Sequence, residues 1–248
     1  MSPSDAEGQS PLDEPGPSAT PEDLSYADFY GHVTAAQLAA WAPQRPGLVL
    51  DLSGRLRWAQ QLRDDGHDVV RVGREALAGV RTVVADPRSL GWLADSCVDA
   101  VLAESVLSSC LAAEESVRDL ARVLRPGGRL LASVDSLLTG LARLADQGRW
   151  AELADVPAAD VVLVPDAAGV IGRCFWPQEL HDLLTSGGFV VDWVRPRSVL
   201  TRLAVERALA EGGAGAMPTL VRTELALARG REGESTGMHL VASARRPA

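Results

Sequence analysis

The sequence predicts a doubly wound α/β fold, and three observations lead to that prediction. Short apolar segments, several of them ending at or followed by an acidic residue, alternate with helical segments along the first half of the chain. The apolar segments are continuous, as expected for parallel strands buried on both faces. The chain of 248 residues is long enough to bury such a sheet beneath helices. We therefore expect a Rossmann-like sheet of seven strands, mostly parallel.

The first half supplies five of the strands. A helix is predicted at 26–41, where Thr34 could cap the second half and Pro43 ends the pattern. Two further helices are predicted at 55–65 and 114–124, and the second of these ends at Arg125-Pro126-Gly127-Gly128. The expected strands are 47–52, 68–72, 82–85, 98–103 and 129–134.

The second half is less regular and supplies the last two strands. The expected strands are 189–194 and 238–244, and a small hairpin is expected at 161–164 and 170–175. The expected helices are 137–150, 177–184, 199–210 and 219–228. Two insertions, about 137–176 and 198–230, are predicted to build a lid on one domain that spans residues 26–248.

Charge is unevenly distributed along the chain. Residues 1–25 hold six acidic residues and no basic one, which indicates a disordered acidic tail; an acidic docking arm is the alternative. The remainder has 27 acidic residues against 24 Arg, and no Lys occurs, a composition typical of GC-rich bacterial coding sequences. A slightly acidic body argues against nucleic-acid substrates.

Cysteine usage and hydropathy suggest a cytoplasmic protein. Cys97, Cys110 and Cys174 are odd in number and too far apart for a zinc ribbon or a redox pair. We expect no signal peptide, because the N-terminus lacks a basic start followed by an apolar stretch. We expect no membrane association, since no run of 18 apolar residues occurs.

Parallel sheets of this kind bind ligands beyond the carboxyl ends of their strands. The predicted site therefore lies around residues 51–54, 72–75, 86 and 103–105. A nicotinamide enzyme would need G-x-G-x-x-G after the first strand, and a metal-dependent enzyme would need clustered carboxylates and histidines; the sequence has neither pattern.

Four segments in order carry a family resemblance. They are Val49-Leu50-Asp51-Leu52, Asp86, Asp99-Ala100-Val101-Leu102, and the run from Arg122 to Leu131 that reads RVLRPGGRLL. Together with Phe175-Trp176-Pro177 and Gly187-Gly188-Phe189, they resemble class I S-adenosylmethionine-dependent methyltransferases of the small-molecule type. The resemblance covers about residues 26–247 and implies a last strand inserted antiparallel between the fifth and sixth.

The resemblance implies a cofactor site for S-adenosylmethionine. Asp51 would order the loop and approach the cofactor amine, or else cap the next helix. Asp86 would accept from the adenine amino group, or else serve as a turn residue before Pro87. Glu104 and Ser105 would face the pocket or form its rim. Asp99 corresponds to a structural acid of the family.

The expected glycine-rich loop is degenerate in this chain. Ser53, Arg55 and Arg57 occupy the three positions where the family has glycine, and only Gly54 offers a bare backbone. The acid that usually binds the ribose is replaced by Gly73, and Glu75 could substitute for it. Arg55 and Arg57 could pair with the cofactor carboxylate or could fill the cavity.

Two functions are consistent with these residues. The first is methyl transfer to a small-molecule acceptor; the alternative is an inactive relative that serves as a scaffold or regulatory partner, and a protein partner or homodimer is compatible with either. His32, His181 and Tyr30 are candidate bases, whereas His67 and His239 look structural, and no base is assigned.

Overall fold

A seven-stranded sheet with the order β3-β2-β1-β4-β5-β9-β8 forms the centre of the molecule. This is a computed structural model, and it describes residues 24–166 and 168–248. The pairs from β3 to β5 are parallel, whereas β9 is antiparallel to both β5 and β8. The strands are β1 (Leu48–Asp51), β2 (Asp68–Gly73), β3 (Thr82–Val84), β4 (Val98–Glu104), β5 (Leu124–Asp135), β8 (Val190–Arg197) and β9 (His239–Arg245). The predicted doubly wound sheet with its inserted last strand is confirmed.

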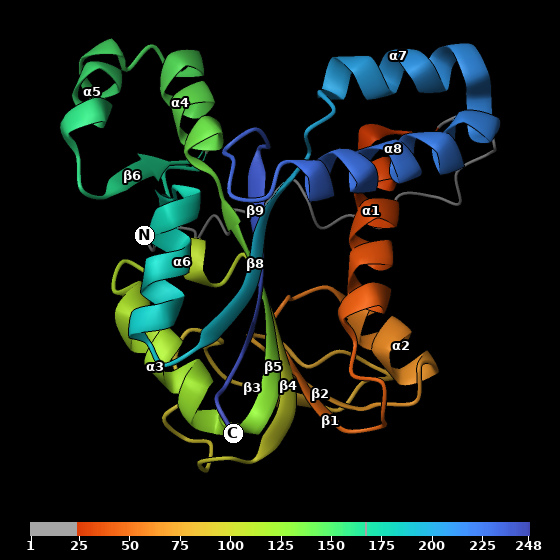
Figure 1. The fold of residues 1–248 in the computed structure, drawn as a ribbon, viewed down its shortest axis with the longest axis vertical. Coiled ribbons are helices and arrows are strands. Elements are labelled where there is room, and N and C mark those ends of the chain that lie inside the picture. The colour runs from red at the N-terminus through yellow and green to blue at the C-terminus, as the bar shows by residue number, and fades with distance from the viewer. Residues whose placement is uncertain (1–23, 167) are drawn as a thin grey trace, which may run out of the picture.

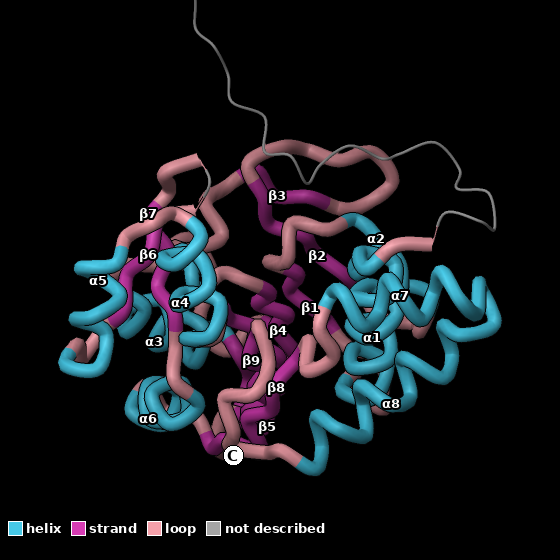
Figure 2. The backbone as a smooth tube through the Cα atoms, turned by 90° about the horizontal axis from the view of Figure 1, so that it is seen from above, coloured by secondary structure: helices cyan, strands magenta, loops and turns pink. Residues whose placement is uncertain are grey.

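Helices cover both faces of the sheet (Figure 2). Helices α1 (Tyr26–Trp41) and α2 (Leu56–Asp64) lie on one side, and α3 (Ala113–Val123) and α6 (Pro177–Ser186) lie on the other. Successive strand residues point to opposite faces, so Val49 packs with Trp58 under α2 while Leu50 packs with Leu120 under α3. The two apolar cores explain why the strands read as continuous apolar runs.

Two lobes rise above the carboxyl edge of the parallel strands (Figure 1). One consists of α4 (Leu137–Asp146), α5 (Trp150–Asp155), η2 (Val156–Ala158) and the hairpin β6 (Val162–Pro165) and β7 (Ile171–Cys174). The other consists of α7 (Arg202–Gly212), η3 (Gly213–Ala216) and α8 (Met217–Gly230), packed on the upper part of α1. Each lobe has its own apolar cluster, distinct from the two main cores.

Several element boundaries differ from those predicted. Residues 137–150 form a helix and the start of a second one, because Gly148 adopts a φ of 67° between them. Strand β5 begins at Leu124, before the Pro-Gly-Gly segment, because Leu124 pairs with Val98. Thr34 does not cap a helix; its hydroxyl donates to the Tyr30 carbonyl at 2.9 Å.

Other sequence expectations concern the N-terminus, the cysteines and membrane spans. The predicted acidic tail falls outside the described residues, except for Leu24 and Ser25, and Ser25 caps α1 in a capping box with Asp28. The three cysteines are free thiols. In the part of the chain that the structure describes, no helix is long and apolar enough to cross a membrane.

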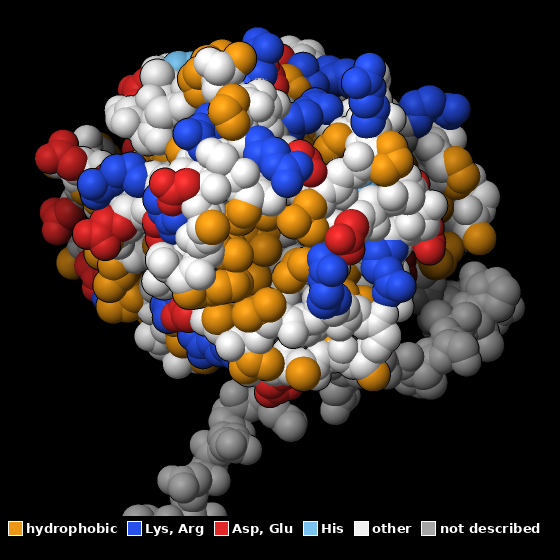
Figure 3. Space-filling model, turned by 90° about the horizontal axis from the view of Figure 1, so that it is seen from below, with side chains coloured by type: hydrophobic (Ala, Val, Ile, Leu, Met, Phe, Trp, Pro, Cys, Tyr) orange, Lys and Arg blue, Asp and Glu red, His pale blue; other side chains and the backbone are white. Residues whose placement is uncertain are grey.

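The face opposite the two lobes is shown in Figure 3. Hydrophobic side chains gather near its centre, and charged side chains of both signs surround them. At this edge Asp99 accepts from the Leu48 backbone N–H at 2.8 Å and pairs with Arg125 at 2.5 Å. Asp99 therefore ties β1 to β4 and has the structural role expected from the sequence.

Candidate functional site

Asp51 ends β1 at the carboxyl edge of the sheet and has no exposed surface. Its Oδ1 accepts from the Ser53 backbone N–H at 2.8 Å, while its Oδ2 is buried without a hydrogen-bond partner among the described residues. Burial raises the pKa of Asp51 to about 6. A buried oxygen without a partner is uncommon in folded proteins, so this atom marks a place where a donor from a ligand could bind.

The loop after β1 is open at Gly54. This glycine has a φ of 72°, and a Cβ placed there would meet no atom within 4 Å. The exposed Arg55 begins α2 without a side-chain cap, so Asp51 does not cap this helix. The loop therefore presents bare backbone three residues after Asp51, whose Oδ1 holds the loop at Ser53.

Arg57 lies against α1. Its guanidinium carbon is 4.1 Å from the centre of the Trp58 ring, and a Cβ on Gly31 of α1 would come within 2.7 Å of its Nη1. Arg57 therefore packs between α2 and α1.

A different arginine, Arg71 of β2, lies between the loops after β1 and β2. Its Nη1 donates to the Glu75 carbonyl at 2.9 Å and its Nη2 to the Gly54 carbonyl at 3.4 Å. The guanidinium fills the space beside Gly73, where a Cβ would lie 2.7 Å from it. The Glu75 side chain is exposed, so Glu75 binds Arg71 through its backbone carbonyl and not through its carboxylate. Sequence reasoning missed Arg71, although a single arginine inside a buried apolar strand was a usable signal.

Asp86 follows β3 and is half-exposed, next to Pro87. The Arg88 guanidinium binds both of its carboxylate oxygens, at 2.9 Å to Oδ1 and 2.6 Å to Oδ2. These hydrogen bonds lower the pKa of Asp86 to about 2. The carboxylate is therefore ionised at neutral pH.

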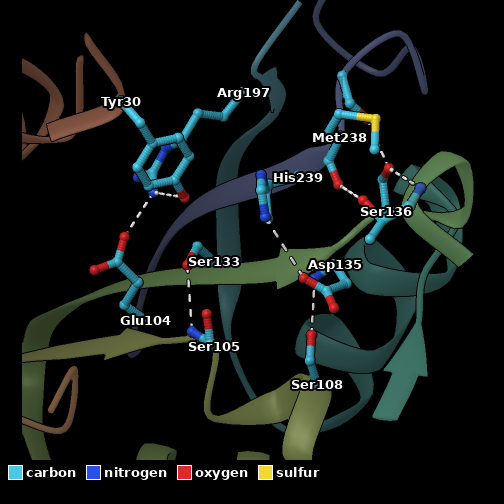
Figure 4. Close-up of polar contacts among 12 residues, drawn as sticks. Tyr30, Glu104, Ser105, Ser108, Ser133, Asp135, Ser136, Arg197, Met238 and His239 are labelled. Atoms are coloured by element: carbon cyan, nitrogen blue, oxygen red, sulfur yellow. Dashed lines mark hydrogen bonds and ion pairs between the residues drawn. The ribbon is translucent and has the colours of Figure 1, made fainter. Parts of the chain in front are cut away.

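Glu104 is the last residue of β4, and its side chain is buried (Figure 4). The Trp58 indole N–H donates to its Oε2 at 2.7 Å, and Arg197 Nη1 donates to its Oε1 at 2.7 Å. Arg197 also donates to the Tyr30 hydroxyl at 3.0 Å and to Gln37 Oε1 at 2.7 Å. The sequence placed Glu104 at the pocket or its rim, whereas both of its oxygens are bonded to protein groups.

Ser105 follows Glu104 with a φ of 60°, a left-handed conformation that is rare for serine. Its side chain is exposed, and its backbone N–H donates to the Ser133 carbonyl at 2.9 Å. Strained residues of this kind often occur at functional sites. The backbone thus turns sharply at the edge of the sheet.

His239, at the start of β9, lies at the same edge between Asp135 and Arg197 (Figure 4). Its Nε2 is 3.6 Å from Asp135 Oδ1, and its ring packs edge-on against Tyr30 with 5.3 Å between ring centres. Of the bases considered from the sequence, Tyr30 belongs to this group. His32 lines an outer groove between α1 and α8, and His181 is exposed on α6 beside Asp182.

Metal ligands do not gather in the described part of the chain. Within residues 24–166 and 168–248, no group of three or more His, Cys, Asp or Glu side chains is arranged to hold a metal ion. The residues described above make up the candidate site: Asp51, the Gly54 loop, Arg71, Asp86, Ser105 and the group around His239.

Doubly wound α/β sheets bind their ligands in the crevice beyond the carboxyl ends of the strands, which is the edge where these residues lie. Comparison with known proteins shows which family has this fold. Residues 30–132 match the model of the "Methyltransferase domain" family. This match covers 103 of the 248 residues, and the chain has the fold of the class I S-adenosylmethionine-dependent methyltransferases.

Solved structures with the same fold support this assignment. A Mesorhizobium loti S-adenosylmethionine-dependent methyltransferase superposes with a TM-score of 0.57 at 17% identity, covering 88% of this chain and 100% of that one. The Burkholderia thailandensis 1,6-didemethyltoxoflavin-N1-methyltransferase, solved with S-adenosylhomocysteine, gives 0.52 at 19% identity and covers 94% and 93%.

A third structure is the complex of the Haloferax volcanii Trm112 methyltransferase activator with a putative methyltransferase. It gives a TM-score of 0.57 at 15% identity and covers 89% of this chain and 92% of that one. At sequence identities of 15% to 19%, the similarity to these three structures shows a shared fold alone. No curated protein matches the sequence.

Proposed function

We propose that the protein transfers a methyl group from S-adenosylmethionine to a small-molecule acceptor. The observation that carries this proposal is the buried Asp51 Oδ2 without a partner, next to the open backbone at Gly54. A carboxylate oxygen accepts hydrogen bonds from an ammonium group, and the family resemblance assigns this acid to the cofactor amine. When bound, the cofactor supplies an electrophilic methyl group.

The residues at the carboxyl edge fit such a ligand. Asp86 is ionised and half-exposed, so it can accept from an adenine amino group after Arg88 rotates aside. Ser53, Gly54 and Arg55 provide the loop, and Gly73, Glu75 and Pro87 lie on neighbouring turns. Arg71 holds the loop after β1 to the turn after β2. The two lobes above this edge would cover the bound molecules and keep water away.

A small acceptor is preferred to a nucleic acid on the basis of charge. The 24 Arg of the chain are outnumbered by 33 Asp and Glu, so the protein lacks a basic excess. The Burkholderia thailandensis neighbour acts on 1,6-didemethyltoxoflavin, which is consistent with a small acceptor here. We keep a cytoplasmic location and a protein partner or homodimer as predictions, the latter to be tested by light scattering.

Calorimetric titration with S-adenosylmethionine and S-adenosylhomocysteine tests the proposal. We expect micromolar binding of both nucleosides, binding at least about 10-fold weaker in Asp51→Ala, and wild-type binding in Asp182→Ala, which alters an exposed acid on α6. Transfer of tritiated methyl groups to a panel of alcohols, phenols, carboxylic acids and amines then identifies the acceptor. No heat with either nucleoside would overturn the proposal in favour of the inactive scaffold.

A further inference from the structure

Three residues form a row across the sheet at its carboxyl edge. His239 on β9 is the direct partner of Asp135 on β5 and of Arg197 on β8. Directly opposed residues of antiparallel strands have side chains on the same face. The imidazole of His239 therefore lies between a carboxylate and a guanidinium that are more than 60 residues apart in sequence (Figure 4).

The start of β9 is held firmly in this place. The Ser136 hydroxyl donates to the Gly237 carbonyl at 2.6 Å, and the Thr139 hydroxyl donates to the Met238 carbonyl. Gly237 packs so closely on β8 that an added Cβ would lie 2.4 Å from the Arg197 carbonyl oxygen. These contacts fix the backbone at Gly237 and Met238, the two residues before His239. They therefore hold the start of β9 in a defined position, as a functional site requires.

The two ring nitrogens of His239 have different surroundings. Nδ1 is buried and has no hydrogen-bond partner among the described residues. The side chain is 28% exposed, so its accessible part lies on the remainder of the ring, which includes Nε2. Asp135 lies 3.6 Å from Nε2, beyond hydrogen-bond distance but close enough to stabilise a positive charge there.

We infer that His239, with its own ring N–H on Nδ1, accepts the proton of the acceptor molecule at Nε2, with Asp135 as a positioning residue. This inference rests on the proposed methyl transfer. It specifies the acceptor as a molecule that reacts through an O–H or N–H group. The acceptor oxygen or nitrogen bonds to the methyl carbon, the carbon–sulfur bond breaks with its electron pair going to sulfur, and the proton passes to Nε2 and then to solvent.

The charges around the ring favour this role at neutral pH. Burial lowers the pKa of His239, Asp135 raises it, and Arg197 lowers it, with smaller effects from Glu104 and Arg143. Glu104 balances Arg197, and Arg143 pairs with Asp135 Oδ2 at 2.7 Å. Tyr30 packs against the ring, and burial raises its own pKa, so it stays neutral. His239 is therefore uncharged at pH 7 and able to take up a proton.

Histidine side-chain NMR of the full chain, with and without S-adenosylhomocysteine, tests the inference. The chain has four histidines, so His239→Gln assigns the resonance. We expect a neutral His239 at pH 7, a shift of its signals on adding S-adenosylhomocysteine, and a lower pKa in Asp135→Asn. The matched control is the exposed His181–Asp182 pair, whose variant Asp182→Asn leaves His239 unchanged.

The outcomes separate the two proposals. Failure of S-adenosylhomocysteine to bind overturns the proposed function and with it the role of His239. Normal binding with His239 signals that stay in place, or with a pKa that does not respond to Asp135→Asn, overturns the inference alone. With the acceptor that the transfer screen identifies, His239→Gln should lower kcat by about 10²- to 10⁴-fold while the affinity for S-adenosylhomocysteine is unchanged.

Discussion

Arg197 and Glu104 form a buried ion pair, with 2.7 Å between Nη1 and Oε1 and side chains that are 2% and 6% exposed. The pair joins β8 to β4, and its hydrogen bonds to Tyr30 and Trp58 extend it to α1 and α2. Removing one member of a buried pair leaves the other as an uncompensated charge, which is strongly destabilising. The ion pair therefore links four elements of the fold next to the group around His239 in the candidate site.

This pairing predicts the stability of single and double variants. Arg197→Met should lower the free energy of unfolding by about 3–5 kcal/mol, because the Glu104 carboxylate stays buried. Arg197→Met with Glu104→Gln should lose less, since no buried charge remains. Arg202→Met, in the exposed Arg202–Glu206 pair, should leave stability nearly unchanged in the same urea titrations. Equal effects of Arg197→Met and Arg202→Met would contradict the prediction.

The buried Asp51 predicts how stability depends on pH. Its pKa rises from 3.8 to about 6 on folding, so the folded protein binds the proton more tightly than the unfolded chain does. Its contribution to stability is therefore full below about pH 4 and is lost as the pH rises to about 6. Asp51→Asn keeps the oxygen that accepts from Ser53 and removes the charge.

We expect the difference in unfolding free energy between Asp51→Asn and wild type to grow by about 2–3 kcal/mol from pH 4 to pH 6, in favour of the variant. Urea unfolding at several pH values measures this difference. A constant difference across the range would show that Asp51 titrates normally.

Arg71 predicts a change in cofactor affinity. It bonds to the carbonyls of Gly54 and Glu75, so Arg71→Met should release both loops and weaken S-adenosylhomocysteine binding by about 10-fold or more. Arg74→Met changes an exposed arginine of the next turn and should bind as wild type does. Calorimetry distinguishes the two variants. Tighter binding by Arg71→Met would instead mean that the guanidinium blocks the ligand.

Gly237 predicts a steric effect at the start of β9. A Cβ there would lie 2.4 Å from the Arg197 carbonyl oxygen, so Gly237→Ala must push β9 away from β8. We expect a loss of about 1–3 kcal/mol in thermal or urea unfolding. Gly215→Ala is the control, because a Cβ there meets nothing within 4 Å, and it should be neutral or slightly stabilising. A neutral Gly237→Ala would show that the two strands separate freely.

Local patterns were sufficient to predict most of the elements. The seven strands of the sheet and the order of helices between them follow from apolar runs and their spacing, because parallel strands buried on both faces need continuous apolar residues. The position of Asp51 at the end of β1 was predicted in the same way, whereas the structural role of Asp99 was predicted from the family resemblance. The missed boundaries, such as the break at Gly148, depend on backbone conformation at single residues.

By itself, the sequence determined the class of fold and the edge of the sheet where polar residues collect, since both depend on short-range periodicity. Only the tertiary structure decided that Arg71 rather than Arg57 bridges the loops, that Glu104 is bonded to Arg197, and that His239 faces Asp135. The contacts of Glu104 and His239 join residues far apart in sequence, and those of His239 depend on the insertion of β9 between β5 and β8. Side-chain partners across the inserted strand depend on its register with two strands that are distant in the sequence, and a shift of one residue would move every side chain of the strand to the other face of the sheet.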